Sequence, residues 1–245
     1  MTRHEIRRAA LLTGGAGIAY GLLSIAAWLL LRLDRAALLE ADDPYAYVAG
    51  AGFTWASLAA TYLLPIAAIL FLWFVVALRG WIRTTQQRRN MLISDLQLVS
   101  AVVFVCLFLV GAAAAATSVV MAETEPGSLS GESLGAVASF GFTLMQTMGV
   151  RMAAVFVIAS ASLGVTTSAL PRWFSLLSYV FGLVLMLTPM AHDAFILAFP
   201  VWVIALSVIL LYHIANLAED EIPGFSERTA VEAEVPSSPA GDTLD

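Results

Sequence analysis

One positively charged residue lies within an otherwise apolar stretch, and polar residues precede it at regular intervals. Ser139, Thr143, Thr147 and Arg151 recur every four residues, with Gln146 beside them. Residues four apart share one face of an α-helix, so these side chains should gather together. A charge at membrane depth is costly unless it is paired, hydrated or able to reach the interface. Two interpretations stay open: an outward-facing polar cleft in which Arg151 binds an anionic ligand, or an arginine that ties helices together through a carboxylate or carbonyl groups.

Two further ionisable residues, His192 and Asp193, stand at the start of the last apolar stretch. Beside Arg151 they could form a proton-linked cluster, because histidine titrates near neutral pH. Alternatively, Asp193 caps the final helix and His192 lies among the lipid headgroups. The two roles are compatible, and the sequence leaves both open.

Polar residues also open the third apolar stretch, which contains Ser94, Asp95 and Gln97. Asp95 could stabilise the positive N-terminal end of its own helix. It could also pair with an arginine, the candidates being Arg88, Arg89 and Arg172. A carboxylate-based proton pump would need a second acidic group deeper in the membrane stretches, and the sequence has none there.

Motifs of known enzymes and metal sites are absent from the sequence. Without lysine the chain cannot form a P-loop for nucleotide phosphates. His4-Glu5 begins like a zinc-protease motif, but Arg8 stands where the second histidine belongs. We therefore expect a non-enzymatic protein with no catalytic residue, no metal, no cofactor and no nucleic-acid partner.

The composition indicates that these residues are carried by membrane-spanning helices. Of the 245 residues, 60% are hydrophobic and 12% are charged, whereas soluble domains have about a quarter of their residues charged. A spanning helix needs roughly 20 apolar residues. Six stretches fit: Leu11–Leu31, Phe53–Leu78, Met91–Val120, Leu134–Val165, Pro171–Leu187 and Phe195–Ile214. The sequence predicts an all-α polytopic bundle of about six transmembrane helices.

The arginines predict how this bundle is oriented. Nine arginines fall on one side of the predicted spans: Arg3, Arg7, Arg8, Arg79, Arg83, Arg88, Arg89, Arg172 and Arg228. The loops on the other side hold only Arg32 and Arg35. Cytoplasmic loops carry the excess of basic residues, so we expect both termini in the cytoplasm. Arg151 precedes Arg172 by about 21 residues, or roughly 31 Å of helix, so if Arg172 marks the inner surface Arg151 lies near the outer one.

The last 27 residues differ in composition from the rest. Residues 219–245 carry eight acidic residues and one basic residue, Arg228. Such a segment has too little apolar surface to fold by itself. We expect a transmembrane domain over residues 1–218 and a disordered acidic cytoplasmic tail over 219–245, which could bind a protein partner.

Small residues mark the places where helices could approach closely. Gly17 and Gly21 form a GxxxG pattern on the first stretch, and Gly111 starts a run of small residues on the third. Contact within the chain and contact between two chains both remain open, so the oligomeric state is not predicted.

Three segments carry a resemblance to known sequences. They are Pro65–Arg79 (PIAAILFLWFVVALR), Arg151–Ser162 (RMAAVFVIASAS) and Pro171-Arg172-Trp173. Together they resemble a group of uncharacterised multi-pass membrane proteins of high-GC Gram-positive (actinobacterial) type. The resemblance spans most of the membrane region and implies a plasma-membrane location. It implies no substrate and no catalytic residue.

Three functional hypotheses follow. The first is a non-enzymatic membrane component that binds lipid or protein partners through its helices and tail. The second is a small transporter or channel with an outward-facing cleft around Arg151. The third, a membrane enzyme acting on lipid substrates, would need acids or histidines clustered at one membrane face, and only His192-Asp193 approaches this.

Overall fold

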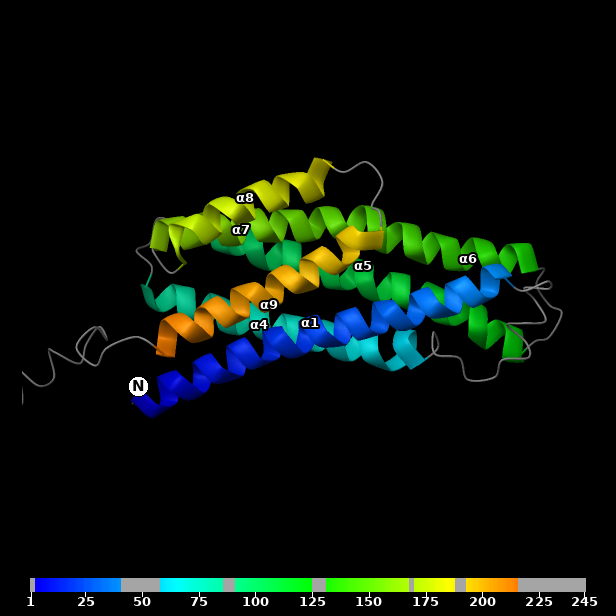
Figure 1. The fold of residues 1–245 in the computed structure, drawn as a ribbon, viewed down its shortest axis with the longest axis horizontal. Helices are drawn as coiled ribbons and strands as arrows, with labels where there is room; N and C mark the ends of the chain where they lie inside the picture. The colour runs from blue at the N-terminus through cyan, green and yellow to red at the C-terminus, as the bar shows by residue number, and fades with distance from the viewer. Residues whose placement is uncertain are drawn as a thin grey trace, which may run out of the picture.

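The computed structural model describes residues 3–40, 58–85, 91–124, 131–167, 170–187 and 193–215. These ranges form six helical segments and contain no strand (Figure 1). In chain order the elements are α1 (Arg3–Glu40), η1 (Ala59–Leu63) running into α4 (Leu64–Thr85), α5 (Met91–Thr124), α6 (Gly131–Thr143) with η3 (Leu144–Gly149) and α7 (Val150–Thr167), α8 (Arg172–Leu187) and α9 (Asp193–Ala215). The predicted all-α bundle is confirmed.

Four helical segments are long and apolar enough to cross a membrane. Their apolar spans are Leu11–Leu33, Thr61–Gly80, Met91–Ala114 and Ser139–Thr167. Two further apolar helices, Arg172–Leu187 and Leu197–Tyr212, are shorter than the roughly 20 residues of a full span. The helices therefore indicate a membrane location.

Apolar side chains cover the outside of this bundle as well as its core. Trp73 on α4 is 67% exposed, whereas Phe71 and Phe74 on the same helix are fully buried. Leu177 on α8 and Leu22 on α1 are exposed too. Water-soluble proteins rarely expose contiguous apolar surface, whereas lipid tails surround it readily. The apolar exterior supports the membrane location independently of helix length.

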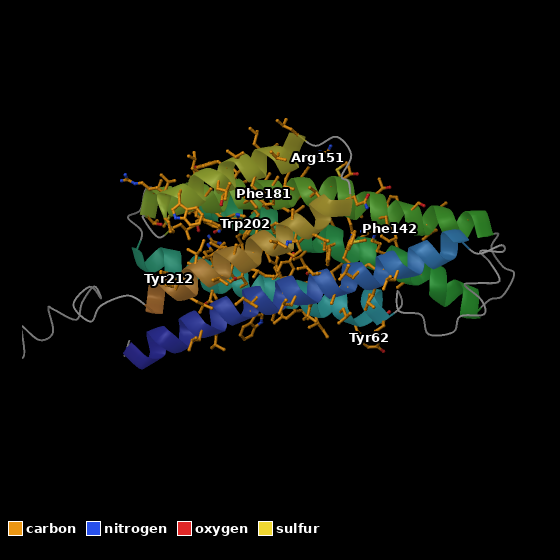
Figure 2. The ribbon with its side chains drawn as sticks, viewed as in Figure 1. Tyr62, Phe142, Arg151, Phe181, Trp202 and Tyr212 are labelled. Carbon is orange, nitrogen blue, oxygen red and sulfur yellow. The ribbon has the colours of Figure 1, made fainter. Side chains whose placement is uncertain are left out.

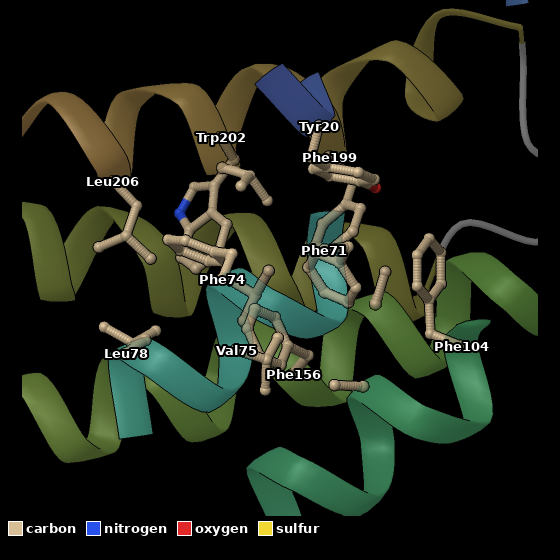
Figure 3. Packing of buried hydrophobic residues seen from close by; sticks show 14 of the residues in the cluster. Tyr20, Phe71, Phe74, Val75, Leu78, Phe104, Phe156, Phe199, Trp202 and Leu206 are labelled. Carbon is tan, nitrogen blue, oxygen red and sulfur yellow. The ribbon is translucent and has the colours of Figure 1, made fainter. Parts of the chain in front are cut away.

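A cluster of aromatic rings forms the centre of the bundle. Phe71 of α4 contacts rings from four other helices, with centroid distances of 4.8 to 5.7 Å (Figure 3). These rings belong to Tyr20 of α1, Phe104 of α5, Phe156 of α7 and Phe199 of α9. The Tyr20 ring is tilted against Phe71, and the other three rings meet it edge to face, as aromatic quadrupoles favour. Five helices are thus packed around one buried side chain.

The packed pair α1 and α9 runs antiparallel. On α1, Gly14 faces Leu211 of α9, and Gly21 faces Ile204, so the order of contacts reverses. We name the two ends of the bundle after residues labelled in Figure 2. The Tyr212 end includes the first turns of α5 and α8, and the Phe142 end includes η1 and η3.

The fourth predicted span is one helical path with an irregular middle. Residues 131–167 are helical throughout, but residues 144–149 form the π-helix η3. Its closing backbone bond joins the Val150 amide to the Met145 carbonyl, five residues earlier. The acidic segment 219–245 lies outside the described residues, so the predicted division at residue 218 stays a prediction.

Candidate functional site

Arg151 lies at the start of α7, immediately after the π-helix. Its guanidinium Nη1 donates a 2.7 Å hydrogen bond to the carbonyl oxygen of Thr147, and its side chain is half-buried. A π-helix bonds i to i+5, so its junction with α-helix leaves a carbonyl without its usual amide donor. The Arg151 guanidinium donates its hydrogen bond to a carbonyl of this π-helix, that of Thr147. Figure 2 shows Arg151 near the level where α8 ends, consistent with Leu185 of α8 packing on Val150.

Thr143, on the same helical path, also bonds within the helix. The Thr143 hydroxyl donates to the Ser139 carbonyl at 2.8 Å, and both residues are exposed. Gln146 and Thr147 are half-buried. Ser139, Thr143, Thr147 and Arg151 lie along one helical path, and their role as a polar cleft stays a prediction. None of the described residues that line the cavity discussed next belongs to this set.

The proposed neighbours of Arg151 cannot be placed beside it. His192 lies outside the described residues, and Asp193 is described only as the first backbone position of α9. The proton-linked cluster and the capping role of Asp193 both remain predictions.

An apolar cavity of about 50 Å³ lies toward the Phe142 end of the bundle. Its aromatic walls come from α1, α5, α6 and α9: Tyr20, Trp28, Phe104, Phe108, Phe142 and Phe199. Met145 of η3 and Ala153 of α7 complete one side. No acidic, basic or histidine residue is found among its described lining residues. The cavity therefore offers mainly shape and apolar contact.

Two hydroxyl groups lie on the α1 wall of this cavity. Ser24 is 5% exposed, and its hydroxyl lies beside that of Tyr20. The Tyr20 side chain, one turn earlier on α1, lines the same space. The cavity is consequently apolar on most sides, with hydroxyl-bearing side chains on the α1 wall.

The Tyr212 end holds a second group of polar residues, which links α4, α5 and α7. Arg79 forms an ion pair with Asp95, whereas the sequence pointed to Arg88, Arg89 or Arg172. The reason is geometric: α4 and α5 are antiparallel neighbours, so Arg79, near the end of α4, faces Asp95, near the start of α5. Deeper in the bundle, the Gln97 amide donates to the Ser160 hydroxyl at 2.8 Å.

The glycines singled out in the sequence lie at close contacts between helices of this chain. A Cβ at Gly17 would come within 2.1 Å of the Ser207 hydroxyl, and one at Gly21 within 2.4 Å of Ile204, both on α9. At Gly111 of α5 it would meet Met145 at 2.4 Å. These positions bring backbones together within one molecule, as small residues do in membrane bundles.

Comparisons with known proteins give no further information about the site. No known protein family matches the sequence, no curated protein is similar to it, and no solved structure matches the fold. Within the described ranges, no group of three His, Cys, Asp or Glu residues could hold a metal ion.

Proposed function

We propose that this chain is a non-enzymatic integral protein of the plasma membrane that holds the end of a lipid acyl chain in the cavity near Phe142. The single observation that carries the proposal is that cavity, which lies inside the bundle and has aromatic walls from several helices. On this account both termini are cytoplasmic, as the arginine distribution predicts.

The size of the cavity favours a chain over a ring. An apolar cavity of about 150 Å³ binds benzene, whereas this one measures about 50 Å³. A narrow hydrocarbon chain end fits such a space better than a sterol or quinone ring does. Burying each methylene contributes about 0.8 kcal/mol when it leaves water, but lipid tails are already apolar. The gain on binding comes from close packing against rigid aromatic walls.

Substituting Ala153 tests this proposal directly. Ala153 is 1% exposed and lines the cavity, so Ala153→Val places two methyl groups in the space available to the ligand. Ala136→Val makes the same change at an exposed position of the same helical path and serves as the matched control. Native mass spectrometry of protein extracted from membranes should show retained phospholipid in wild type and Ala136→Val, and its loss in Ala153→Val. Equal retention in all three proteins would refute the proposal.

The acidic tail offers a second contact, with a protein. Residues 219–245 combine eight acidic residues with one arginine, which suits a basic partner surface. Deleting this segment should remove a co-purifying protein without changing lipid retention. An unchanged set of partners would exclude the tail as a docking segment.

A transporter or channel with a cleft around Arg151 is the alternative, and one observation favours it. The π-helix η3 lies directly before Arg151, and π-helical turns are frequent at functional sites. This alternative requires water along Ser139, Thr143 and Thr147. Cysteines placed there, in a Cys106→Ala background, should then react with aqueous thiol reagents, whereas cysteines facing lipid should not.

A further inference from the structure

Three buried polar atoms on α4 and α5, near the Tyr212 end, have no hydrogen-bond partner among the described residues. They are the Oγ of Ser94, the Oε1 of Gln97 and the Nε of Arg79. Ser94 is 3% exposed and Gln97 is fully buried. Buried polar atoms are almost always hydrogen-bonded to protein or to ordered water. Arg79 pairs with Asp95, which is next to Ser94 on α5. Three exceptions on two helices joined by this ion pair therefore point to a ligand.

The surrounding bonds leave these atoms with defined roles. Gln97 donates through Nε2 to the Ser160 hydroxyl, which itself donates to the Phe156 carbonyl, so Oε1 remains as an acceptor. Ser94 lies one turn before Gln97 on the same face of α5. Arg79 uses Nη2 for Asp95, so Nε remains as a donor. The free atoms thus include a donor, an acceptor and a hydroxyl that can act as either.

This combination of donor and acceptor atoms restricts which small ligand can bind. A cation would suit Gln97 Oε1 and the Ser94 hydroxyl, but the Arg79 guanidinium would repel it. An anion would suit Arg79 Nε, but Asp95 and the Gln97 oxygen would repel it. Water donates to the oxygens and accepts from the guanidinium, and buried waters typically make about three such bonds. Of these small ligands, only water suits all three atoms.

We propose that ordered water occupies a polar site formed by Arg79, Ser94, Gln97 and Ser160 between α4, α5 and α7. Asp95 is 60% exposed and Arg79 13% exposed, so their ion pair marks the route by which water enters from the Tyr212 end. Phe156 lies one turn beyond Ser160, and its ring packs against Phe71 and Phe199. The aromatic cluster therefore closes the site on its deep side and keeps its water apart from the lipid cavity.

Cysteine reactivity at two adjacent positions distinguishes a hydrated site from dry packing. Ser160 and Ala161 are 2% and 0% exposed and lie at the same depth on α7. A thiol reacts as the thiolate, which forms readily only where water is present. In a Cys106→Ala background in nanodiscs, Ser160→Cys should react with a small water-soluble methanethiosulfonate at least about tenfold faster than Ala161→Cys. Adding Gln97→Leu should bring the rate at Ser160→Cys down to the control rate. Equal rates at both cysteines would overturn the proposal.

A second measurement needs no cysteine and applies if Ser160→Cys fails to fold. In water-edited solid-state NMR of glutamine-labelled protein, the Gln97 side-chain amide, assigned by its loss in Gln97→Leu, should receive magnetisation from water. Buildup as slow as that of the lipid-facing backbone would show that the site is dry. The test is independent of lipid retention, so it can fail or succeed separately from the proposed function.

Discussion

Several polar side chains of this bundle donate hydrogen bonds to their own helix. The hydroxyls of Thr143, Ser160 and Ser207 each bond the carbonyl four residues earlier, and the Arg151 guanidinium does the same. Serine and threonine commonly make such local bonds in helices. For Arg151, however, the sequence suggested a ligand site or a tie between helices, and its hydrogen bond stays within its own helical path. Bonds between helices, such as Trp202 to Ser178, depend on which helices become neighbours, so sequence reasoning missed them.

At this scale we predict that Arg151 is structural. Arg151→Gln should lower the free energy of unfolding by about 1–2 kcal/mol, because one charge-assisted hydrogen bond to a half-buried carbonyl is lost. Unfolding in mixed micelles would measure the change, and lipid retention should stay at the wild-type level. A variant of unchanged stability that loses bound lipid would instead make Arg151 a ligand-binding residue.

At the scale of the helices, the close contact between α1 and α9 depends on glycine residues, which have no side chain. Gly17→Ala should destabilise the protein by about 1–3 kcal/mol, the usual cost of overpacking, because the new Cβ would clash with Ser207 and Phe74. Gly15→Ala, two residues away, meets nothing within 4 Å and is the matched control. Thermal unfolding, monitored by size-exclusion chromatography, should show a lower midpoint temperature for Gly17→Ala only. Similar midpoints for both variants would argue against this packing.

The aromatic cluster around Phe71 joins five helices, whereas a contact such as that at Gly21 joins two. Phe71→Ala should cost about 3–5 kcal/mol, since it removes a large buried side chain and leaves a cavity. Trp73→Ala truncates a larger side chain on the same helix that is 67% exposed, so it should cost far less. Denaturant unfolding of the two variants in parallel provides the comparison. An equal loss of stability would mean that the centre of the bundle lies elsewhere.

For the whole molecule, sequence patterns predicted the helices well but did not predict the apolar cavity or the polar site at the Tyr212 end. The stretch Leu134–Val165 became one helical path, yet nothing in its residues signalled the π-helix at Leu144–Gly149. The apolar runs predicted membrane helices because hydrophobicity is a property of each segment alone. The cavity draws its walls from residues as distant as Tyr20 and Phe199, so it emerges only when the helices pack. The Arg79–Asp95 pair arises in the same way.

The orientation of the molecule is a prediction at this scale as well. Because basic residues stay on the cytoplasmic side, a fluorescent protein fused after Asp245 should fluoresce in bacterial cells. Alkaline phosphatase fused at the same position should be inactive. Active phosphatase there would reverse the orientation and place the lipid cavity in the inner half of the membrane.

Photocrosslinking tests the central claim, a lipid chain held inside the bundle, most directly. A phospholipid with a diazirine near the end of one acyl chain would be incorporated into membranes containing the protein, irradiated, and the crosslinked peptides sequenced. We predict crosslinks at cavity residues such as Phe108, Phe142 and Met145, and their loss in Ala153→Val. Crosslinks confined to exposed residues such as Leu177 and Trp73, unchanged in Ala153→Val, would show that lipid only surrounds the protein and would contradict the account.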